Sequence, residues 1–217
     1  MLSGIRTMFQ KRTLSSYDAT LPREQLIQAG RLVMVDDETP PLLEELRKVG
    51  FSVDHDKTAD DLRHFDGQLY DVAIIDYHGV GRNLGTAQGL ELIKYIRRVS
   101  PRTRIIAYTS RSLSAAESEF YRLSHAVLPK DLGLGESLAI IEAQLQKALS
   151  KEHLFEALLE KLAVSDPHER TRIERALVKA IRVRRESKFR DFVESMSGKV
   201  AEAAVTIIIS KIFTGGM

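Results

Sequence analysis

The stretch that decides the fold is Val72-Ala73-Ile74-Ile75-Asp76, four apolar residues followed by a carboxylate. The same pattern occurs earlier, where Leu32 to Val35 run into Asp36-Asp37. Between and after these short apolar runs lie longer segments whose apolar residues recur with the period of a helix. This alternation predicts an α/β fold in which helices cover a parallel sheet.

A strand and a helix alternate five times in this interpretation, and a helical region follows. A helix in the tail is expected to begin at Pro167, because Asp166 precedes it as an N-cap and Glu169 follows as a capping-box acid. Beyond Pro167 we expect one long helix or two stacked ones. The expected strands are 32–35, 51–53, 72–75, 104–108 and 126–128, and the expected helices before the tail are 42–49, 59–65, 90–96, 115–123 and 135–150.

Length and composition set the broad class of the protein. The 217 residues are 43% hydrophobic and 29% charged, as in folded, water-soluble proteins. The net charge of +2 gives no global attraction to nucleic acid or membranes. No cysteine is present, which excludes disulfides and thiolate sites and fits the cytoplasm, and no apolar run has the length of a membrane span. We expect an N-terminal extension at 1–30, a main domain at 31–150 and a helical extension at 151–217.

Polar residues of complementary chemistry follow four of the expected strands. They are Asp36 and Asp37, then Asp76, Thr109 and Lys130. Ligands of open α/β sheets bind at the carboxyl ends of the strands, so these side chains are expected to converge. Three neighbouring carboxylates repel one another unless a hard cation such as Mg²⁺ joins them. A lysine can neutralise an incoming phosphoryl group, a hydroxyl can bind its oxygen, and an aspartate can be the nucleophile.

This set, in this order, resembles the receiver domain of bacterial two-component response regulators, over about residues 30–150. The resemblance implies a doubly wound, flavodoxin-like sheet with strand order 2-1-3-4-5. It also implies that Asp76 accepts a phosphoryl group from a histidine kinase or a phosphotransfer protein, without further enzymatic activity. Asp37, Asp76 and the backbone carbonyl of His78 would ligate Mg²⁺, with Asp36 acting through water. Lys130 would pair with the phosphoryl group, and Thr109 would move to bind it.

Two departures from the family pattern concern the loop after Asp76 and the coupling residue on the fifth strand. The loop 77–89 carries about five extra residues, and its glycines predict mobility. Where the family has an aromatic residue that couples to the threonine, this chain has Val127. Tyr108 or His125 are candidates to substitute for it.

Three interpretations of the output remain open. The apolar stripe from Phe189 to Phe213 favours a homodimer through the C-terminal helices, with packing onto the main domain as the alternative. The basic run from Arg182 to Arg190 makes binding to DNA an alternative. A degenerate receiver that acts as a constitutive docking module is the third.

Overall fold

The computed structural model describes residues 13–18, 20–66, 69–110, 115–197 and 203–214. The chain divides into two compact units. The sheet unit is Leu21–Leu149, and the helical unit combines the segment up to Thr20 with the chain from Ser150 onwards. Among the described residues, no helix combines the length and the apolar character needed to cross a membrane.

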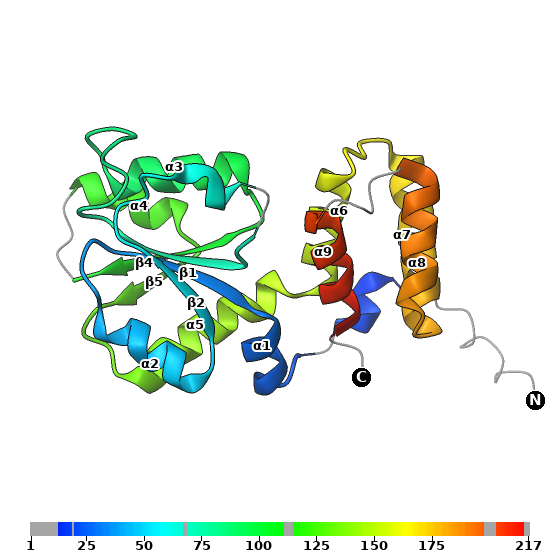
Figure 1. Cartoon of the computed structure of the whole chain (residues 1–217), viewed down its shortest axis with the longest axis horizontal. Coiled ribbons are helices and arrows are strands. Elements are labelled where there is room, and N and C mark those ends of the chain that lie inside the picture. Colours follow the sequence, from blue (N-terminus) through cyan, green and yellow to red (C-terminus); the bar gives the residue numbers. More distant parts are fainter. Residues whose placement is uncertain (1–12, 19, 67–68, 111–114, 198–202, 215–217) are drawn as a thin grey trace, which may run out of the picture. The chain divides into compact units, whose positions relative to one another are not determined.

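The sheet unit contains a five-stranded parallel sheet with the order β2-β1-β3-β4-β5, which confirms the expected fold (Figure 1). All five expected strands are present, each of them at least one residue longer than predicted. The strands are β1 (Arg31–Val35), β2 (Ser52–Asp56), β3 (Val72–Asp76), β4 (Arg104–Thr109) and β5 (Ala126–Pro129).

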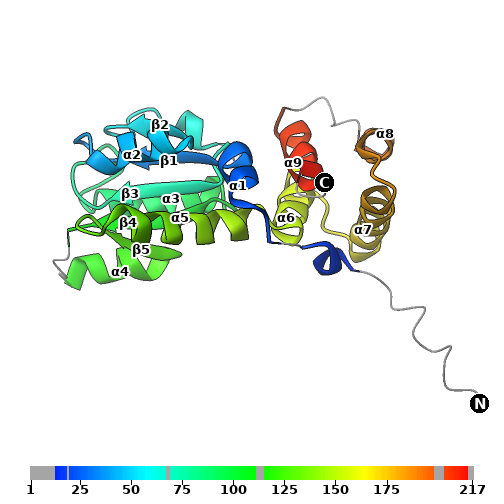
Figure 2. The same ribbon diagram turned by 90° about the horizontal axis from the view of Figure 1, so that it is seen from below.

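Helices cover both faces of this sheet (Figure 1), and Figure 2 looks onto the sheet from a second direction. One face packs against α1 (Arg23–Ala29), α2 (Pro41–Val49) and α5 (Leu134–Ala148). The other packs against η2 (Leu62–Phe65), α3 (Gly89–Val99) and α4 (Ala115–Leu123). Alternate residues of each strand point to opposite faces, so Met34 and Ile74 enter one core while Val35 and Ile75 enter the other.

The expected helix 59–65 was wrong, since only the 3-10 helix η2 forms there. The Asp56 carboxylate accepts hydrogen bonds from the backbone N–H groups of Thr58 and Ala59. Ala59 also has φ +56°, which is incompatible with a right-handed helix. The fifth helix likewise ends at Ala148 rather than 150, because Ser150 caps the helix that follows.

The helical unit contains η1 (Leu14–Tyr17), α6 (Lys151–Lys161), α7 (Pro167–Arg182), α8 (Glu186–Ser197) and α9 (Ala203–Thr214). The start at Pro167 is confirmed, with Asp166 accepting hydrogen bonds from the N–H groups of His168 and Glu169. The expectation of one or two helices beyond Pro167 was wrong, because the described part of the tail already contains three. Arg184, at φ +52°, reverses the chain between α7 and α8.

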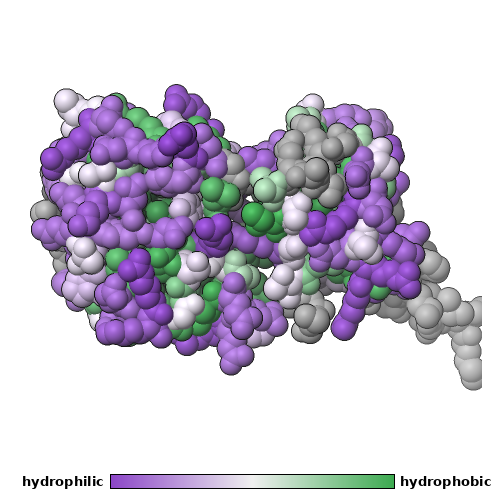
Figure 3. Space-filling view, in the orientation of Figure 1, coloured by the Kyte–Doolittle hydropathy of each residue, from purple (hydrophilic) through white to green (hydrophobic). Residues whose placement is uncertain are grey.

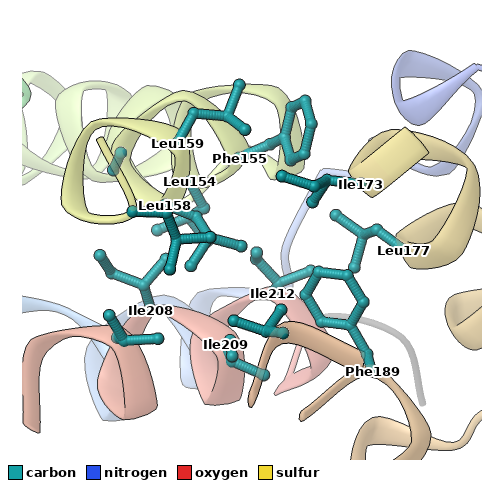
Figure 4. Close-up of a cluster of buried hydrophobic side chains, with 14 of the residues drawn as sticks. Leu154, Phe155, Leu158, Leu159, Ile173, Leu177, Phe189, Ile208, Ile209 and Ile212 are labelled. Atoms are coloured by element: carbon teal, nitrogen blue, oxygen red, sulfur yellow. The ribbon is translucent and has the colours of Figure 1, made fainter. Parts of the chain in front are cut away.

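The apolar stripe of the tail forms the core of this unit. The side chains of this core come from α6, α7, α8 and α9 and point toward one another (Figure 4). Phe189, Ile209 and Ile212 are at most 1% exposed. Hydrophilic residues make up most of the visible surface of each unit (Figure 3). The premise for dimerisation, an exposed apolar stripe, is therefore wrong, and the oligomeric state itself stays a prediction.

Candidate functional site

The carboxyl ends of β1 and β3 bring three aspartates together. Asp36 and Asp37 directly follow β1, and Asp76 is the last residue of β3. One carboxylate oxygen from each lies within 4.8 Å of the other two. Asp36 and Asp76 are buried, whereas Asp37 is exposed. The three aspartates expected at this site thus do meet.

Lys130 joins the two buried carboxylates. Its Nζ donates hydrogen bonds to Asp36 Oδ2 and to Asp76 Oδ2, both at 2.9 Å. It also lies 5.0 Å from the centroid of the Tyr108 ring, a cation–π arrangement. The Lys130 backbone N–H donates to the carbonyl of Thr109 at 2.7 Å, which fixes the start of the loop after β5. Because a buried carboxylate without a partner is costly, Lys130 stabilises the cluster when no metal is bound.

The burial of the cluster also sets the charge state of its members. Burial raises the pKa of Asp76, and the hydrogen bond from Lys130 opposes that rise only in part. For Lys130, burial opposes the charged form, but the hydrogen bonds to Asp36 and Asp76 outweigh it and raise the pKa. Lys130 therefore stays protonated at neutral pH and supplies a positive charge beside Asp76.

The loop 77–89 is packed against its surroundings, and its expected mobility stays a prediction. Val80 is fully buried, and the Gly81 N–H donates to the carbonyl of Thr58 at 2.8 Å. The Gly79 N–H donates to Gln88 Oε1, also at 2.8 Å. Glycine is needed at two points of this loop. Gly79 has φ +77°, and a Cβ there would lie 2.1 Å from the Asp37 carboxyl group, whereas a Cβ on Gly89 would lie 2.3 Å from the Asp76 carbonyl.

The same loop places a cation at the exposed aspartate. Arg82 lies with its guanidinium 3.8 Å from Asp37 Oδ2, and its side chain is 70% exposed. Each of the three carboxylates therefore has a positive side chain near it. The sequence did not predict the position of Arg82. The spacing of residues in an inserted loop does not indicate which of them will lie next to the ends of the strands.

Thr109 ends β4 and makes a contact that the sequence did not indicate. Its hydroxyl lies 2.8 Å from the Tyr121 hydroxyl of α4. Neither residue proposed to replace the missing aromatic partner makes this contact. His125 accepts a hydrogen bond from the Ile105 N–H through Nδ1, and Tyr108 contacts Lys130. Val127 is 40% exposed.

Residues of β2 also hold the backbone at the end of β1 in place. His55 Nε2 lies 3.0 Å from the Asp36 carbonyl, and the Asp36 N–H donates to the Asp56 carbonyl at 3.2 Å. The Glu38 N–H donates to Asp36 Oδ1 at 3.0 Å. These bonds orient Asp36 before any ligand binds.

Comparison with solved structures finds receiver domains of response regulators. A CheY-like receiver domain protein from Methanospirillum hungatei JF-1 is 19% identical at a TM-score of 0.46, over 55% of this chain and 95% of that one. The signal receiver domain of an HD domain-containing protein from Pseudomonas fluorescens Pf-5 is 17% identical at a TM-score of 0.48, over 57% and 91%. The apo receiver domain of nitrogen regulatory protein C is 25% identical at a TM-score of 0.46, over 55% and 97%.

These comparisons describe a likeness of fold, and the matched structures cover a little more than half of the chain. The strand order described above is that of the flavodoxin-like receiver fold. Comparison with protein-family models found no match, and comparison with curated proteins also found none.

Proposed function

We propose that this protein is a response regulator of two-component signalling in the cytoplasm, and that Asp76 accepts a phosphoryl group from the phosphohistidine of a histidine kinase or a phosphotransfer protein. One observation carries the proposal. A protonated lysine bridges two buried aspartates at 2.9 Å each, and a third aspartate lies beside them at the carboxyl ends of parallel strands.

The cluster fits Mg²⁺ by the chemistry of its donors. Mg²⁺ prefers oxygen ligands, and the three carboxylates offer oxygens close enough to share one ion. Asp37 and Asp76 would hold it directly, with the backbone carbonyl of His78 as a further ligand and Asp36 acting through water. When bound, Mg²⁺ offsets the negative charge of the phosphoryl oxygens.

The protein's own groups then position the reaction. A carboxylate oxygen of Asp76 attacks phosphorus, a P–O bond forms, and the P–N bond to the donor imidazole breaks. Lys130 pairs with the transferred phosphoryl group, and the Thr109 hydroxyl donates to one of its oxygens. The protein is thus a phosphoacceptor whose chemistry is limited to its own phosphorylation and dephosphorylation.

The helical unit would carry the output through interaction with another protein or through self-association of its helices. A specific observation keeps DNA as a second candidate. Between residues 167 and 197 the sequence has nine Lys or Arg and five Asp or Glu. Arg190 is paired with Glu186, whereas Arg182, Arg184, Arg185 and Lys188 are exposed. Binding to DNA would weaken steeply with salt, so titrations at two salt concentrations separate the candidates.

The first experiment is intact-mass spectrometry of the full chain after incubation with Mg²⁺ and a small phosphodonor such as acetyl phosphate. We expect one phosphoryl adduct that is lost with chelator and in Asp76→Asn. The matched control is Asp191→Asn, which removes an exposed carboxylate of α8 and should leave the adduct unchanged. Absence of any adduct would contradict the proposal and favour a constitutive docking module. An adduct retained in Asp76→Asn would place the acceptor elsewhere.

A further inference from the structure

Two side-chain contacts connect α4 with the end of the sheet that carries Asp76. The first is the 2.8 Å contact between the hydroxyl groups of Thr109 and Tyr121. In the second, the ring of Tyr77, the residue after Asp76, packs edge-to-face on Phe120 with centroids 5.3 Å apart. Phe120 is fully buried, so α4 has little freedom to move without disturbing this contact.

Either hydroxyl can donate in the contact between Thr109 and Tyr121, and the Thr109 oxygen points toward α4 while this contact is made. The Thr109 backbone is held in place, because the Thr109 carbonyl accepts from the Lys130 N–H at 2.7 Å. A change of partner must then come from rotation of the side chain. A hydroxyl bonds a charged phosphoryl oxygen about twice as strongly as a neutral hydroxyl. A phosphoryl group on Asp76 would therefore compete successfully with Tyr121 for Thr109.

We propose that Tyr121 is a positioning residue that holds the Thr109 hydroxyl toward α4 while Asp76 is unmodified. When Thr109 turns to the phosphoryl group, Tyr121 loses this partner and the last turns of α4 loosen. Tyr121, on α4, thereby couples to Thr109 in place of the aromatic residue expected on β5. Val127 occupies that β5 position and has neither a hydroxyl nor a ring. This inference rests on the proposed function, because it needs a phosphoryl group on Asp76.

The test is hydrogen exchange of α4 in the full chain, with and without Mg²⁺ and beryllofluoride as the phosphoryl mimic. In the unsubstituted protein the mimic should accelerate exchange at the end of α4 by roughly fivefold, the ratio that one net hydrogen bond of about 1 kcal/mol corresponds to. In Tyr121→Phe the exchange should already be fast without the mimic, and the mimic should change it little. Thr109→Val should behave like Tyr121→Phe in the absence of the mimic.

The matched control is Tyr95→Phe. Tyr95 lies on α3 and donates its hydroxyl proton to Asp66 at 3.0 Å, so this variant removes a phenolic hydroxyl that is not bonded to Thr109. It should keep the full response of α4 to the mimic. If Tyr121 only stabilised α4, Tyr121→Phe would show faster exchange in α4 but would keep the full response to the mimic.

Intact-mass spectrometry of the same proteins with acetyl phosphate separates the two ways of failing. If Asp76 takes no phosphoryl group, the proposed function fails and this inference fails with it. If Asp76 is phosphorylated and α4 responds to the mimic by the same ratio in Tyr121→Phe as in the unsubstituted protein, the proposed function stands. The role of Tyr121 is then overturned.

Discussion

The sheet unit and the helical unit bury their apolar residues in different ways. The sheet unit has two hydrophobic clusters, one on each face of a single sheet. Between them the carboxyl ends of the strands form an edge where Asp36, Asp76 and Lys130 meet. The helical unit has one cluster shared by its helices, and its described residues present no such edge. The edge of a layered fold thus provides a place for a polar site, whereas the apolar residues of this bundle form a single shared core.

The largest expected effect tests whether the two units are independent. Phe189→Ala removes a ring that is 1% exposed in the core of the helical unit. Such a change costs about 3–5 kcal/mol of unfolding free energy. Denaturant unfolding followed by circular dichroism should show a destabilised helical transition, while phosphorylation of Asp76 continues. Val183→Ala, at a side chain 49% exposed, is the control and should change little. Loss of phosphorylation in Phe189→Ala would show that the units depend on one another.

The next effect tests the packed loop beside the site. Gly79→Ala introduces a Cβ 2.1 Å from the Asp37 carboxyl group, at φ +77°. Asp37 must then move, so Mg²⁺ affinity measured by titration calorimetry should fall roughly tenfold or more, which is about 1.4 kcal/mol. Gly135→Ala is the control, because its Cβ would meet nothing within 4 Å. Equal affinities of the two variants would rule out Asp37 as a ligand.

A smaller effect is expected at the start of α7. Asp166→Ala removes the carboxylate that accepts hydrogen bonds from the N–H groups of His168 and Glu169. Loss of an N-cap costs about 1 kcal/mol. The helical transition should shift by that amount, and Mg²⁺ affinity should not change. Ser165→Ala, at the neighbouring exposed position, serves as the comparison. A shift of the same size in both variants would show that the cap contributes nothing specific.

The smallest effect concerns the cation next to Asp37. Arg82→Gln removes a guanidinium 3.8 Å from Asp37 Oδ2 that Mg²⁺ would have to displace. Exposed ion pairs are weak, so Mg²⁺ affinity should rise only about two- to fivefold at low salt. Arg63→Gln removes the same charge from a pair with Asp61 and should have no such effect. Weaker Mg²⁺ binding in Arg82→Gln would show that Arg82 supports the site.

The sequence predicted the parts of the molecule that follow from periodicity. Strands such as Val72–Asp76 are short apolar runs, and their order placed Asp36, Asp76 and Lys130 at one edge. Contacts that depend on tertiary packing were not predictable. Arg82 reaches Asp37 only because Val80 anchors the loop, and Tyr121 meets Thr109 only through the position of α4. In the tail, the apolar stripe was visible, but the partners expected for it were a second chain or the main domain, whereas it packs within the helical unit itself.

The helical unit is discontinuous in sequence, and this has a consequence for how the protein is made. Leu14 belongs to its core, and Asp18 accepts a hydrogen bond from the Lys151 N–H at 2.5 Å. The ribosome therefore synthesises the first piece of this unit, then the whole sheet unit, and only then the helices that complete it. The sheet unit can fold as it emerges, whereas Leu14 stays uncovered until the helices after Ser150 have been made. During that interval the nascent chain has a complete sheet unit and an incomplete helical unit.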